Sequence, residues 1–359
     1  MTAPVDHEVV IIGAGFGGVG AAIELKRQGI DNILILERED DLGGTWHVNH
    51  YPGLAVDIPS VTYSYSFEPN PFWSRLFAPG SELKKYAVHV ADKYDLHQHM
   101  RFNTAVQGAR WDEDESCWVI SLAGGETVTT RYLVGATGYL SQPYRPEIAG
   151  IDDFAADVLH TSAWDDSYDL TGKRVAVIGT GATAVQLIPE VAKVAGELTV
   201  YQRTAIYVTA KTDFAMPKSV QRIFARFPIT QRAARAVSTS LLEVLMVAGV
   251  LKYRQFRRIN ARASNLAMRN LGRHIKDPEM RKKLTPDYSF GCKRPTFSNT
   301  YFPTFNKPNV HLETTPIDHF EADGIVTTDG KKTTIDTLVL ATGYNLWDDN
   351  LPAFEVIGR

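Results

Sequence analysis

Residues 7–37 read HEVVIIGAGFGGVGAAIELKRQGIDNILILE, and this stretch decides the fold because it predicts a strand, a tight turn, a helix and a second strand. An apolar β-branched run meets Gly13, Gly15 and Gly18 in the spacing G-x-G-x-x-G, and the strand NILILE ends in Glu37. Such glycines allow the turn, the approach of the backbone to a pyrophosphate and the packing of helix on strand, while the acid can bind a ribose 2′-hydroxyl. The combination favours a dinucleotide-binding unit over a glycine-rich structural turn.

Residues 173–204 repeat this plan in the sequence KRVAVIGTGATAVQLIPEVAKVAGELTVYQRT, with Gly179, Gly181 and the permitted alanine, Ala184. At the matching offset, 24 residues after Gly179, the acid is replaced by Arg203. A guanidinium can bind a 2′-phosphate through two hydrogen bonds, whereas a carboxylate repels it. The first unit therefore suits FAD or NAD and the second suits NADPH. The alternative for Arg203 is a solvated charge at a strand end.

The composition of the 359-residue chain is that of a soluble globular protein long enough for two domains, with 44% apolar and 22% charged residues. A net charge of −3 gives no electrostatic reason to expect nucleic acid as a partner. The two cysteines, Cys117 and Cys292, lie far apart, which argues against a disulfide framework, a structural zinc and a dithiol reductase. This cysteine usage indicates a reducing, intracellular setting, and the N-terminus lacks the features of a signal peptide, so we expect a cytoplasmic protein.

A third repeat predicts how the domains are connected. The stretches YLVGATGYL at 132–140 and TLVLATGYN at 337–345 are apolar strands that end in Ala-Thr-Gly-Tyr, and they bracket the second nucleotide unit. We expect an α/β fold with two Rossmann-like dinucleotide-binding domains, the second inserted into the first. The expected bounds are 1–147 and 341–359 for the FAD-binding domain, 155–211 and 286–340 for the NADPH-binding domain, and 212–285 for a helical insertion.

Two other regions have recognisable patterns. Between Arg101 and Gly138, runs such as CWVISL and TVTTRYLV predict an antiparallel meander. In the insertion, residues 241–259 have helical spacing with one apolar face and several arginines nearby, but the apolar part is too short to span a bilayer. The insertion is expected to pack over the NADPH-binding domain, or alternatively to make a basic, amphipathic contact with a membrane surface.

The stretch between the two nucleotide units resembles a family signature. FAADVLHTSAWD at 154–165 is similar to the FxGxxxHTxxW(P/D) signature of Baeyer–Villiger monooxygenases, with Ala156 in place of the glycine. The matching residues are Phe154, His160, Thr161, Trp164 and Asp165. Further matches to the family pattern are GGTW at 43–46, YPG followed by Asp57 at 51–57, ATGYLSQP at 136–143, QRT at 202–204 and GCKRP at 291–295.

This resemblance implies an activity and its cofactors. Such enzymes use FAD and NADPH to insert one oxygen of O2 beside a ketone carbonyl, which gives an ester or lactone through a C4a-peroxyflavin. The resemblance also implies that Arg294 is the permanent cation beside the anionic peroxide and that Asp57 is its carboxylate partner. Lys293 is then expected to join Arg203 at the 2′-phosphate. The alternative for Lys293 and Arg294 is an exposed loop pair.

The motifs together predict the residues that bind the cofactors. These are Gly13, Gly15, Gly18, Glu37, Gly44, Thr45, Trp46, Asp57, Gly179, Gly181, Ala184, Arg203, Thr204 and Lys293.

His160 of the signature is expected to tie its segment down by hydrogen bonds, which we favour over a role in proton transfer. Because the two nucleotide domains must shift about this linker, we expect His160 and Trp164 to hold the hinge in a competent pose.

The sequence departs from the family pattern in two places. Ala55 stands where an arginine is common, and only residues 345–359 follow the second Ala-Thr-Gly-Tyr, whereas the family continues much further. We therefore expect an incomplete FAD-binding domain that retains less than one flavin per chain. The expected substrates are a ketone and O2. The alternatives are a flavin monooxygenase that oxygenates nitrogen or sulfur, and an inactive, truncated nucleotide-binding remnant or segment of a split protein.

Overall fold

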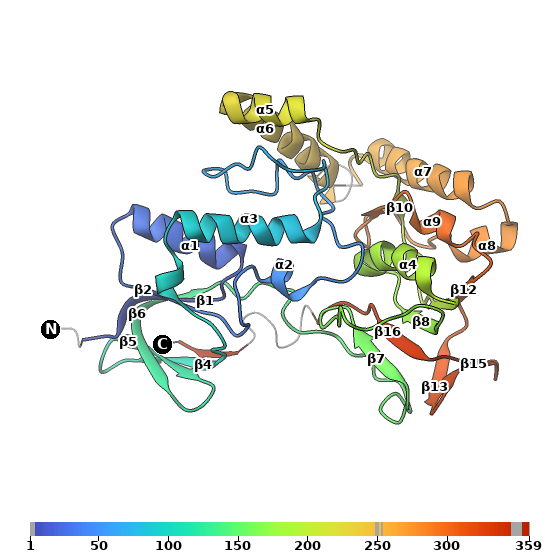
Figure 1. Cartoon of the computed structure of the whole chain (residues 1–359), viewed down its shortest axis with the longest axis horizontal. Helices are drawn as coiled ribbons and strands as arrows, with labels where there is room; N and C mark the ends of the chain where they lie inside the picture. Colours follow the sequence, from blue (N-terminus) through green and yellow to red (C-terminus); the bar gives the residue numbers. More distant parts are fainter. Residues whose placement is uncertain (1–3, 248–250, 253, 346–353, 359) are drawn as a thin grey trace. The chain divides into compact units, whose positions relative to one another are not determined.

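The computed structural model describes residues 4–247, 251–252, 254–345 and 354–358, and the chain divides into two compact units (Figure 1). The first unit consists of residues 1–50, 80–144 and 344–359, and the second consists of residues 51–79 and 145–343.

The two Ala-Thr-Gly-Tyr sequences lie within a few residues of the last two passages between the units. Residues 51–79 group with the second unit, although the expected bounds place them in the first domain. The reason is long-range pairing: the Leu76 N–H donates to the Phe214 carbonyl, and Arg75 pairs with Asp213. The assignment of each expected domain to a cofactor stays a prediction.

The first unit is built on a mixed sheet with the strand order β17-β4-β5-β6-β1-β2-β3. Strand β1 runs parallel to β2 and β6, whereas β4, β5 and β6 form the antiparallel meander expected between Arg101 and Gly138, which is confirmed. The elements are β1 (His7–Ile12), α1 (Phe16–Arg27), β2 (Ile33–Leu36), α2 (Thr45–Val48), α3 (Gly80–Lys93), the 3-10 helix η1 (His97–His99), β3 (Met100–Arg101), β4 (Val106–Asp112), β5 (Cys117–Leu122), β6 (Thr127–Gly135) and β17 (Glu355–Ile357).

The core of this unit lies between the parallel strands and the helices that cover them. The last four residues of β1 are buried, as expected for a strand that is covered on both faces. Helix α1 presents Val19, Ala22 and Ile23, all fully buried, and α1 and α3 lie on the same side of the sheet (Figure 1).

The second unit contains a parallel sheet with the order β12-β9-β8-β16-β7, a three-stranded antiparallel sheet β13-β14-β15 and a short parallel pair β10-β11. Its strands are β7 (Asp157–His160), β8 (Arg174–Ile178), β9 (Glu197–Tyr201), β10 (Val208–Thr209), β11 (Thr296–Phe297), β12 (Val310–Glu313), β13 (Ile317–Glu321), β14 (Gly324–Thr327), β15 (Lys332–Thr334) and β16 (Thr337–Leu340). Its helices are α4 (Ala182–Val194), α5 (Lys218–Arg226), α6 (Pro228–Met246), α7 (Arg257–His274), α8 (Pro278–Lys283) and α9 (Tyr301–Thr304).

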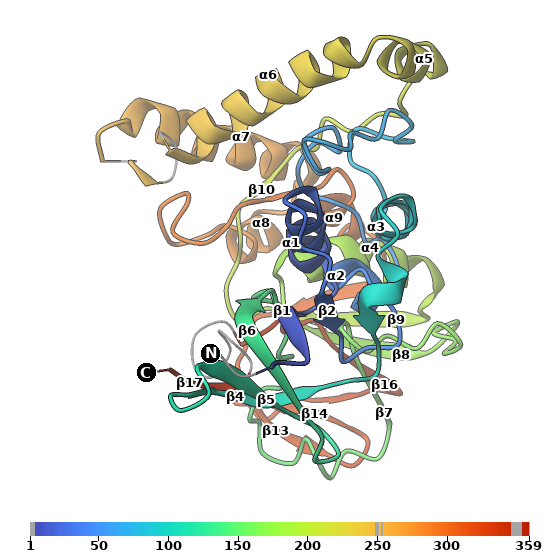
Figure 2. The same ribbon diagram turned by 90° about the vertical axis from the view of Figure 1, so that its left-hand side faces the viewer.

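The expected helical insertion contains α5 to α8, and Figure 2 shows α5 turning into the long helix α6. Helix α7 packs on the body of its unit, where Leu271 is buried and the Asn270 amide donates to the Val208 carbonyl at 3.1 Å. Helix α6 contacts the 51–79 segment through Arg235, which donates to the Ser64 carbonyl at 2.7 Å. Residues 248–250 of the apolar stretch lie outside the described residues. Among the helices that the structure describes, none has both the length and the apolar character needed to cross a membrane.

Candidate functional site

The glycine turn of the first unit can be formed only without side chains. Gly13 has φ +107°, and a Cβ there would lie 2.5 Å from the Ala136 carbonyl oxygen. A Cβ on Gly18 would lie 1.8 Å from the Gly13 oxygen. Gly15 caps α1 with an extended backbone, and no side chain of the described residues caps this end. The first N–H groups of α1 therefore lie at a positive helix end that is suited to phosphate.

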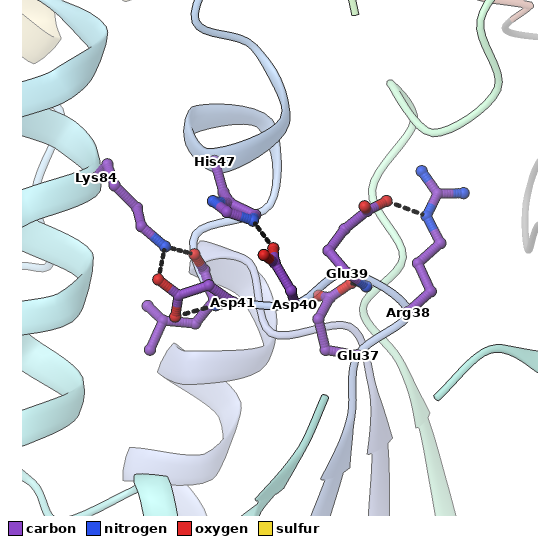
Figure 3. Close-up of polar contacts among 8 residues, drawn as sticks. Glu37, Arg38, Glu39, Asp40, Asp41, His47 and Lys84 are labelled. Carbon is purple, nitrogen blue, oxygen red and sulfur yellow. Dashed lines mark hydrogen bonds and ion pairs between the residues drawn. The ribbon is translucent and has the colours of Figure 1, made fainter. Parts of the chain in front are cut away.

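Glu37 follows β2 and faces this turn. Its carboxylate is 7% exposed, accepts a hydrogen bond from the Ala14 N–H at 2.8 Å and accepts a second from the Glu39 N–H at 3.1 Å. Figure 3 shows Glu37 at the start of the loop of residues 37–41, which carries four acidic side chains and is called the acidic loop below. The acid lies beside the glycine turn, as the sequence predicts, and part of its hydrogen-bonding capacity is already used by the protein.

Two basic side chains from neighbouring helices contact the acidic loop, Lys84 of α3 and His47 of α2 (Figure 3). The Lys84 ammonium lies 2.6 Å from the Asp41 carboxylate, and the His47 ring lies 2.7 Å from Asp40. Burial raises the pKa of Asp41, but the hydrogen bonds from Lys84 and from the Leu42 N–H outweigh it and leave the pKa below its usual value. These contacts with Lys84 and His47 therefore hold the acidic loop beside the glycine turn.

The GGTW motif lies directly on the glycine turn. The Gly43 N–H donates to the Ala14 carbonyl at 2.9 Å, and a Cβ on Gly44 would lie 3.0 Å from the Gly15 Cα. Because two backbones meet here, a glycine is required at this position. Thr45 and Trp46 follow in α2, and both are half-buried.

The glycine turn of the second unit repeats this backbone. Gly179 has φ +121°, and a Cβ there would lie 2.3 Å from the Ala341 oxygen. Gly181 caps α4 with an extended backbone, and no side-chain cap is found among the described residues. Ala184 is fully buried in α4. The first two positions of this turn therefore repeat the construction of the first unit, whereas the third position accommodates the Ala184 side chain.

The second strand of the nucleotide motif ends one residue earlier, relative to its glycine turn, in the second unit than in the first. Ile12 pairs with Leu36 in the first unit, and Ile178 pairs with Tyr201 in the second. The residue after each second strand is therefore Glu37 in one unit and Gln202 in the other, so the expectation that Arg203 occupies the place of Glu37 is wrong by one residue. The physical reason is that the connection between the paired strands is one residue shorter in the second unit.

The neighbouring strands confirm this register. The Glu37 N–H donates to the Arg101 carbonyl at 3.0 Å, and the Gln202 N–H donates to the Glu313 carbonyl at 2.8 Å. The Gln202 amide is buried and donates to the Lys283 carbonyl at 2.7 Å. Arg203 is exposed beyond it. Contact of the Arg203 guanidinium with a 2′-phosphate stays a prediction.

Thr204 and Lys293 are the other residues expected to bind the nucleotide beside Arg203. Thr204 is half-buried, and its carbonyl accepts a hydrogen bond from the Thr180 hydroxyl at 2.9 Å. The exposed Lys293 ammonium lies 5.2 Å from the centre of the Tyr288 ring. Within the described residues, no ion pair or side-chain hydrogen bond joins Lys293 to Arg203, so their joint contact with a phosphate stays a prediction.

Arg294 and Asp57 form an ion pair within the second unit. The Arg294 Nη2 donates to the Asp57 Oδ2 at 2.6 Å, with side chains 61% and 31% exposed. Arg294 lies just before β11, which pairs with β10, and the Val56 N–H before Asp57 donates to the Ala78 carbonyl at 3.0 Å. The two residues are 237 positions apart in sequence and meet as the family resemblance implies.

Sequence reasoning missed a second cation near this pair. Lys211 lies two residues after β10, with its ammonium 4.7 Å from the centre of the Phe77 ring. Burial lowers the pKa of Lys211, and the charges of Asp213 and Asp57 partly oppose this shift. The only signal in the sequence was a lysine seven residues after the QRT motif.

The signature segment begins as the edge strand β7, which pairs with β16. The His160 Nδ1 lies 2.7 Å from the Ser162 hydroxyl, and its Nε2 lies 3.3 Å from the Thr342 hydroxyl. These contacts are those of a ring that ties down its segment, as we favoured. The hinge role stays a prediction.

The other signature residues make packing and hydrogen-bond contacts within the second unit. Phe154 packs edge-on against Phe320 at 5.6 Å between ring centres, and Trp164 is 7% exposed in the core. The Thr161 N–H donates to the Leu340 carbonyl at 3.1 Å. Asp165 accepts two hydrogen bonds from Ser167, which lower the pKa of Asp165.

Comparisons with known proteins identify the family. Residues 10–226 match the family model described as pyridine nucleotide-disulphide oxidoreductase. A Baeyer–Villiger monooxygenase of Streptomyces coelicolor is 40% identical over 95% of this chain and 64% of its own length. A Baeyer–Villiger monooxygenase of Pseudomonas aeruginosa is also 40% identical, over 98% of this chain and 66% of its own length. A Baeyer–Villiger monooxygenase of Pseudooceanicola batsensis is 33% identical, and the chain covers 72% of it. The chain thus spans less than two thirds of the length of the first two relatives.

Solved structures give the same result. An oxidized steroid monooxygenase bound to NADP superposes with a TM-score of 0.86 at 34% identity, covering 98% of this chain and 74% of that one. An open crystal structure of cyclohexanone monooxygenase gives 0.85 at 31% identity, covering 98% and 76%. The expected α/β fold with two Rossmann-like units is confirmed. On fold, motifs and identity, the chain belongs to the Baeyer–Villiger monooxygenase family.

Proposed function

We propose that this chain acts as an FAD- and NADPH-dependent monooxygenase that inserts one oxygen of O2 beside a ketone carbonyl, giving an ester or lactone. The observation that carries the proposal is the 2.6 Å ion pair between Arg294 and Asp57. An arginine keeps its charge at every relevant pH, so it suits a site where negative charge develops on oxygen.

The residues of the two units fit the two cofactors. The turn at Gly13 leaves no room for a side chain, the start of α1 carries no side-chain cap among the described residues, and Glu37 faces the turn. These features suit the pyrophosphate and ribose of FAD. The second turn at Gly179 and the exposed Arg203 suit NADPH.

When bound, FAD supplies the electron transfer from NADPH to O2 and the transfer of one oxygen atom. The protein supplies binding, orientation and charge. In this proposal Arg294 stabilises negative charge on the reacting oxygen, and Asp57 fixes the direction of its guanidinium. Arg203, Thr204 and Lys293 bind the phosphorylated ribose, and Glu37 binds the ribose of FAD.

The test is product analysis with purified, FAD-supplemented protein, NADPH and a ketone that also carries a thioether. Ester formation supports the proposal, whereas sulfoxide formation alone supports the alternative, a heteroatom-oxygenating enzyme. Arg294→Ala is expected to abolish ester formation, while Arg174→Ala, a control in the same unit, retains it. If NADPH reduces no flavin, the chain is an inactive remnant and the proposal fails.

For the surroundings of the enzyme, we also propose peripheral contact of the α5–α6 surface with anionic lipid in a cytoplasmic location. This surface exposes Ile229 and Val237, each 70% exposed, together with the exposed cations Arg222, Arg226 and Arg232. Apolar side chains beside cations suit an anionic membrane surface. Flotation with vesicles containing phosphatidylserine, compared with neutral vesicles, tests the contact, and Val237→Ser should weaken it. Equal recovery with both kinds of vesicle would contradict the contact.

A further inference from the structure

The Gln186 side chain hydrogen-bonds the segment before Asp57 to α4 of the second unit. Gln186 lies in α4, five residues beyond Gly181. Its Nε2 donates to the Ala55 carbonyl at 2.9 Å, and its Oε1 accepts from the Tyr51 hydroxyl at 3.2 Å and from the Ala55 N–H at 3.4 Å. One amide therefore meets both polar groups of the Ala55 backbone.

The segment also lies directly on the backbone of α4. Gly53 has φ +85°, and a Cβ there would lie 2.6 Å from the Gln186 carbonyl oxygen. Tyr51 is 6% exposed and packs in the same apolar cluster as Ala184 and Ile188 of α4. The contact of this segment with the helix is thus apolar at Tyr51, close at Gly53 and hydrogen-bonded at Ala55.

Only Val56 separates the fastened Ala55 from Asp57. Val56 is 2% exposed, and its N–H donates to the Ala78 carbonyl at 3.0 Å. The backbone is therefore held on both sides of this short link, and the Asp57 carboxylate is presented to Arg294 at 2.6 Å. A carboxylate on a fixed backbone loses less conformational entropy when it pairs with an arginine.

We propose that Gln186 is a positioning residue, which fixes the Tyr51–Ala55 segment on α4 and thereby sets the Asp57 carboxylate opposite Arg294. The catalytic meaning of this inference rests on the proposed function, but the contacts that carry it lie within the protein and do not depend on that function. It predicts that Arg294 gains freedom when Gln186 is lost, even though the two side chains make no direct hydrogen bond among the described contacts.

The test measures the modification of Arg294 by phenylglyoxal in protein without added cofactor, read by mass spectrometry of its peptide. Ion pairing with Asp57 slows this reaction, so Asp57→Asn should accelerate it by up to about fivefold, the factor for a strong exposed ion pair. Gln186→Met should give a similar acceleration. The double variant should react no faster than the faster single variant, because both changes remove the same restraint.

Arg174 provides the matched internal reference. It pairs with Asp336 at 2.6 Å in the same unit and is 45% exposed. Its rate should be unchanged in every variant. If Gln186→Met leaves Arg294 at the wild-type rate while Asp57→Asn accelerates it, the proposal is overturned. Acceleration of Arg174 together with Arg294 would also overturn it, since that result indicates general loosening.

Milder variants keep the test valid if Gln186→Met does not fold. Gln186→Glu keeps the acceptor for Tyr51 but loses the donor to Ala55, so an intermediate rate is expected. Tyr51→Phe removes one of the three hydrogen bonds and should give the smallest rise. Rates of Arg294 that do not follow this order would contradict the proposal.

Kinetics separate this inference from the proposed function. In active protein, Gln186→Met should lower kcat for ester formation and leave the KM for NADPH unchanged, because Gln186 lies beyond the first turn of α4. A change in KM alone would count against the positioning role. A wild-type protein without activity would defeat the proposed function, whereas the phenylglyoxal comparison would still decide the inference.

Discussion

The two glycine turns of this protein share one backbone design but differ in the chemistry around it. Gly13 and Gly179 each face the carbonyl of an Ala-Thr-Gly-Tyr alanine, and a Cβ would approach that oxygen to 2.5 and 2.3 Å. Gly15 and Gly181 cap the following helices with nearly equal dihedral angles. Where backbone atoms meet a phosphate, the geometry allows little variation.

The side chains at the strand ends beside the two turns differ, in contrast to the turns themselves. Glu37 is buried and bound to the Ala14 N–H, whereas its counterpart Gln202 binds the Lys283 carbonyl and leaves the outer place to Arg203. The neighbouring strands end in Arg101 and Glu313. The difference shows that the side chains at the strand ends can change while the turn keeps its backbone.

The largest expected effect tests the third glycine position. Gly18→Ala places a Cβ 1.8 Å from the Gly13 oxygen, so we expect a loss of at least about 3 kcal/mol in the free energy of unfolding. The matched change Ala184→Gly should cost only about 1 kcal/mol, chiefly through backbone entropy. Chemical denaturation measures both losses. Equal losses would contradict the expected difference between the two turns at their third position.

The next effect concerns nucleotide preference. Arg203→Gln should weaken NADP+ binding by roughly 10- to 100-fold, the range for a lost hydrogen bond to a charged group, and leave NAD+ binding unchanged. Glu37→Gln, the control in the other unit, should not alter this preference. Calorimetric titration gives both affinities, and an unchanged ratio for Arg203→Gln would refute the assignment of NADPH to the second unit.

A smaller effect concerns Glu313 at the end of β12, whose contribution to the free energy of unfolding should depend on pH. Burial raises the pKa of Glu313, but hydrogen bonds from Thr315 and Lys331 outweigh it and lower the pKa to about 2. A carboxylate with a lowered pKa stabilises the fold above its unfolded pKa, and this stability is lost as the pH falls through the folded pKa. Glu313→Gln should therefore cost about 2 kcal/mol above pH 5 and progressively less toward pH 2.

Arg101 is the matched control for Glu313 in the first unit. Its guanidinium pairs with Glu126, and both side chains are well exposed. Arg101→Gln should therefore destabilise the protein less than Glu313→Gln near neutral pH. Thermal unfolding across this pH range is the measurement, and a pH-independent loss for Glu313→Gln would contradict the role given to its carboxylate.

The smallest effect tests which residue of the second unit, Gln202 or Arg203, faces the nucleotide. Gln202→Ala removes the hydrogen bond to the Lys283 carbonyl and should cost about 1 kcal/mol in stability. Since this amide points to Lys283, the variant should keep the wild-type preference between NADP+ and NAD+. A changed preference would mean that Gln202, and not Arg203, contacts the nucleotide.

The sequence alone predicted both turns, the meander before Gly138 and the α/β class, because these depend on local periodicity and on glycine's access to positive φ. It also indicated Asp57 and Arg294 as partners, but only through the family resemblance. The grouping of residues 51–79 with the second unit and the position of Lys211 near Asp57 had no comparable local signal, since both depend on contacts between segments far apart in the chain.

For this protein, residue spacing by itself determined where the backbone turns and which helices begin there, since sterics and hydrogen bonding act over a few residues. Only the tertiary structure decided which side chain lies at each strand end. The pairing of Ile178 with Tyr201 moves Arg203 one place outward, and a count along the chain cannot detect this shift. Register is set by pairing across the sheet, and a slip of one residue turns a side chain to the opposite face.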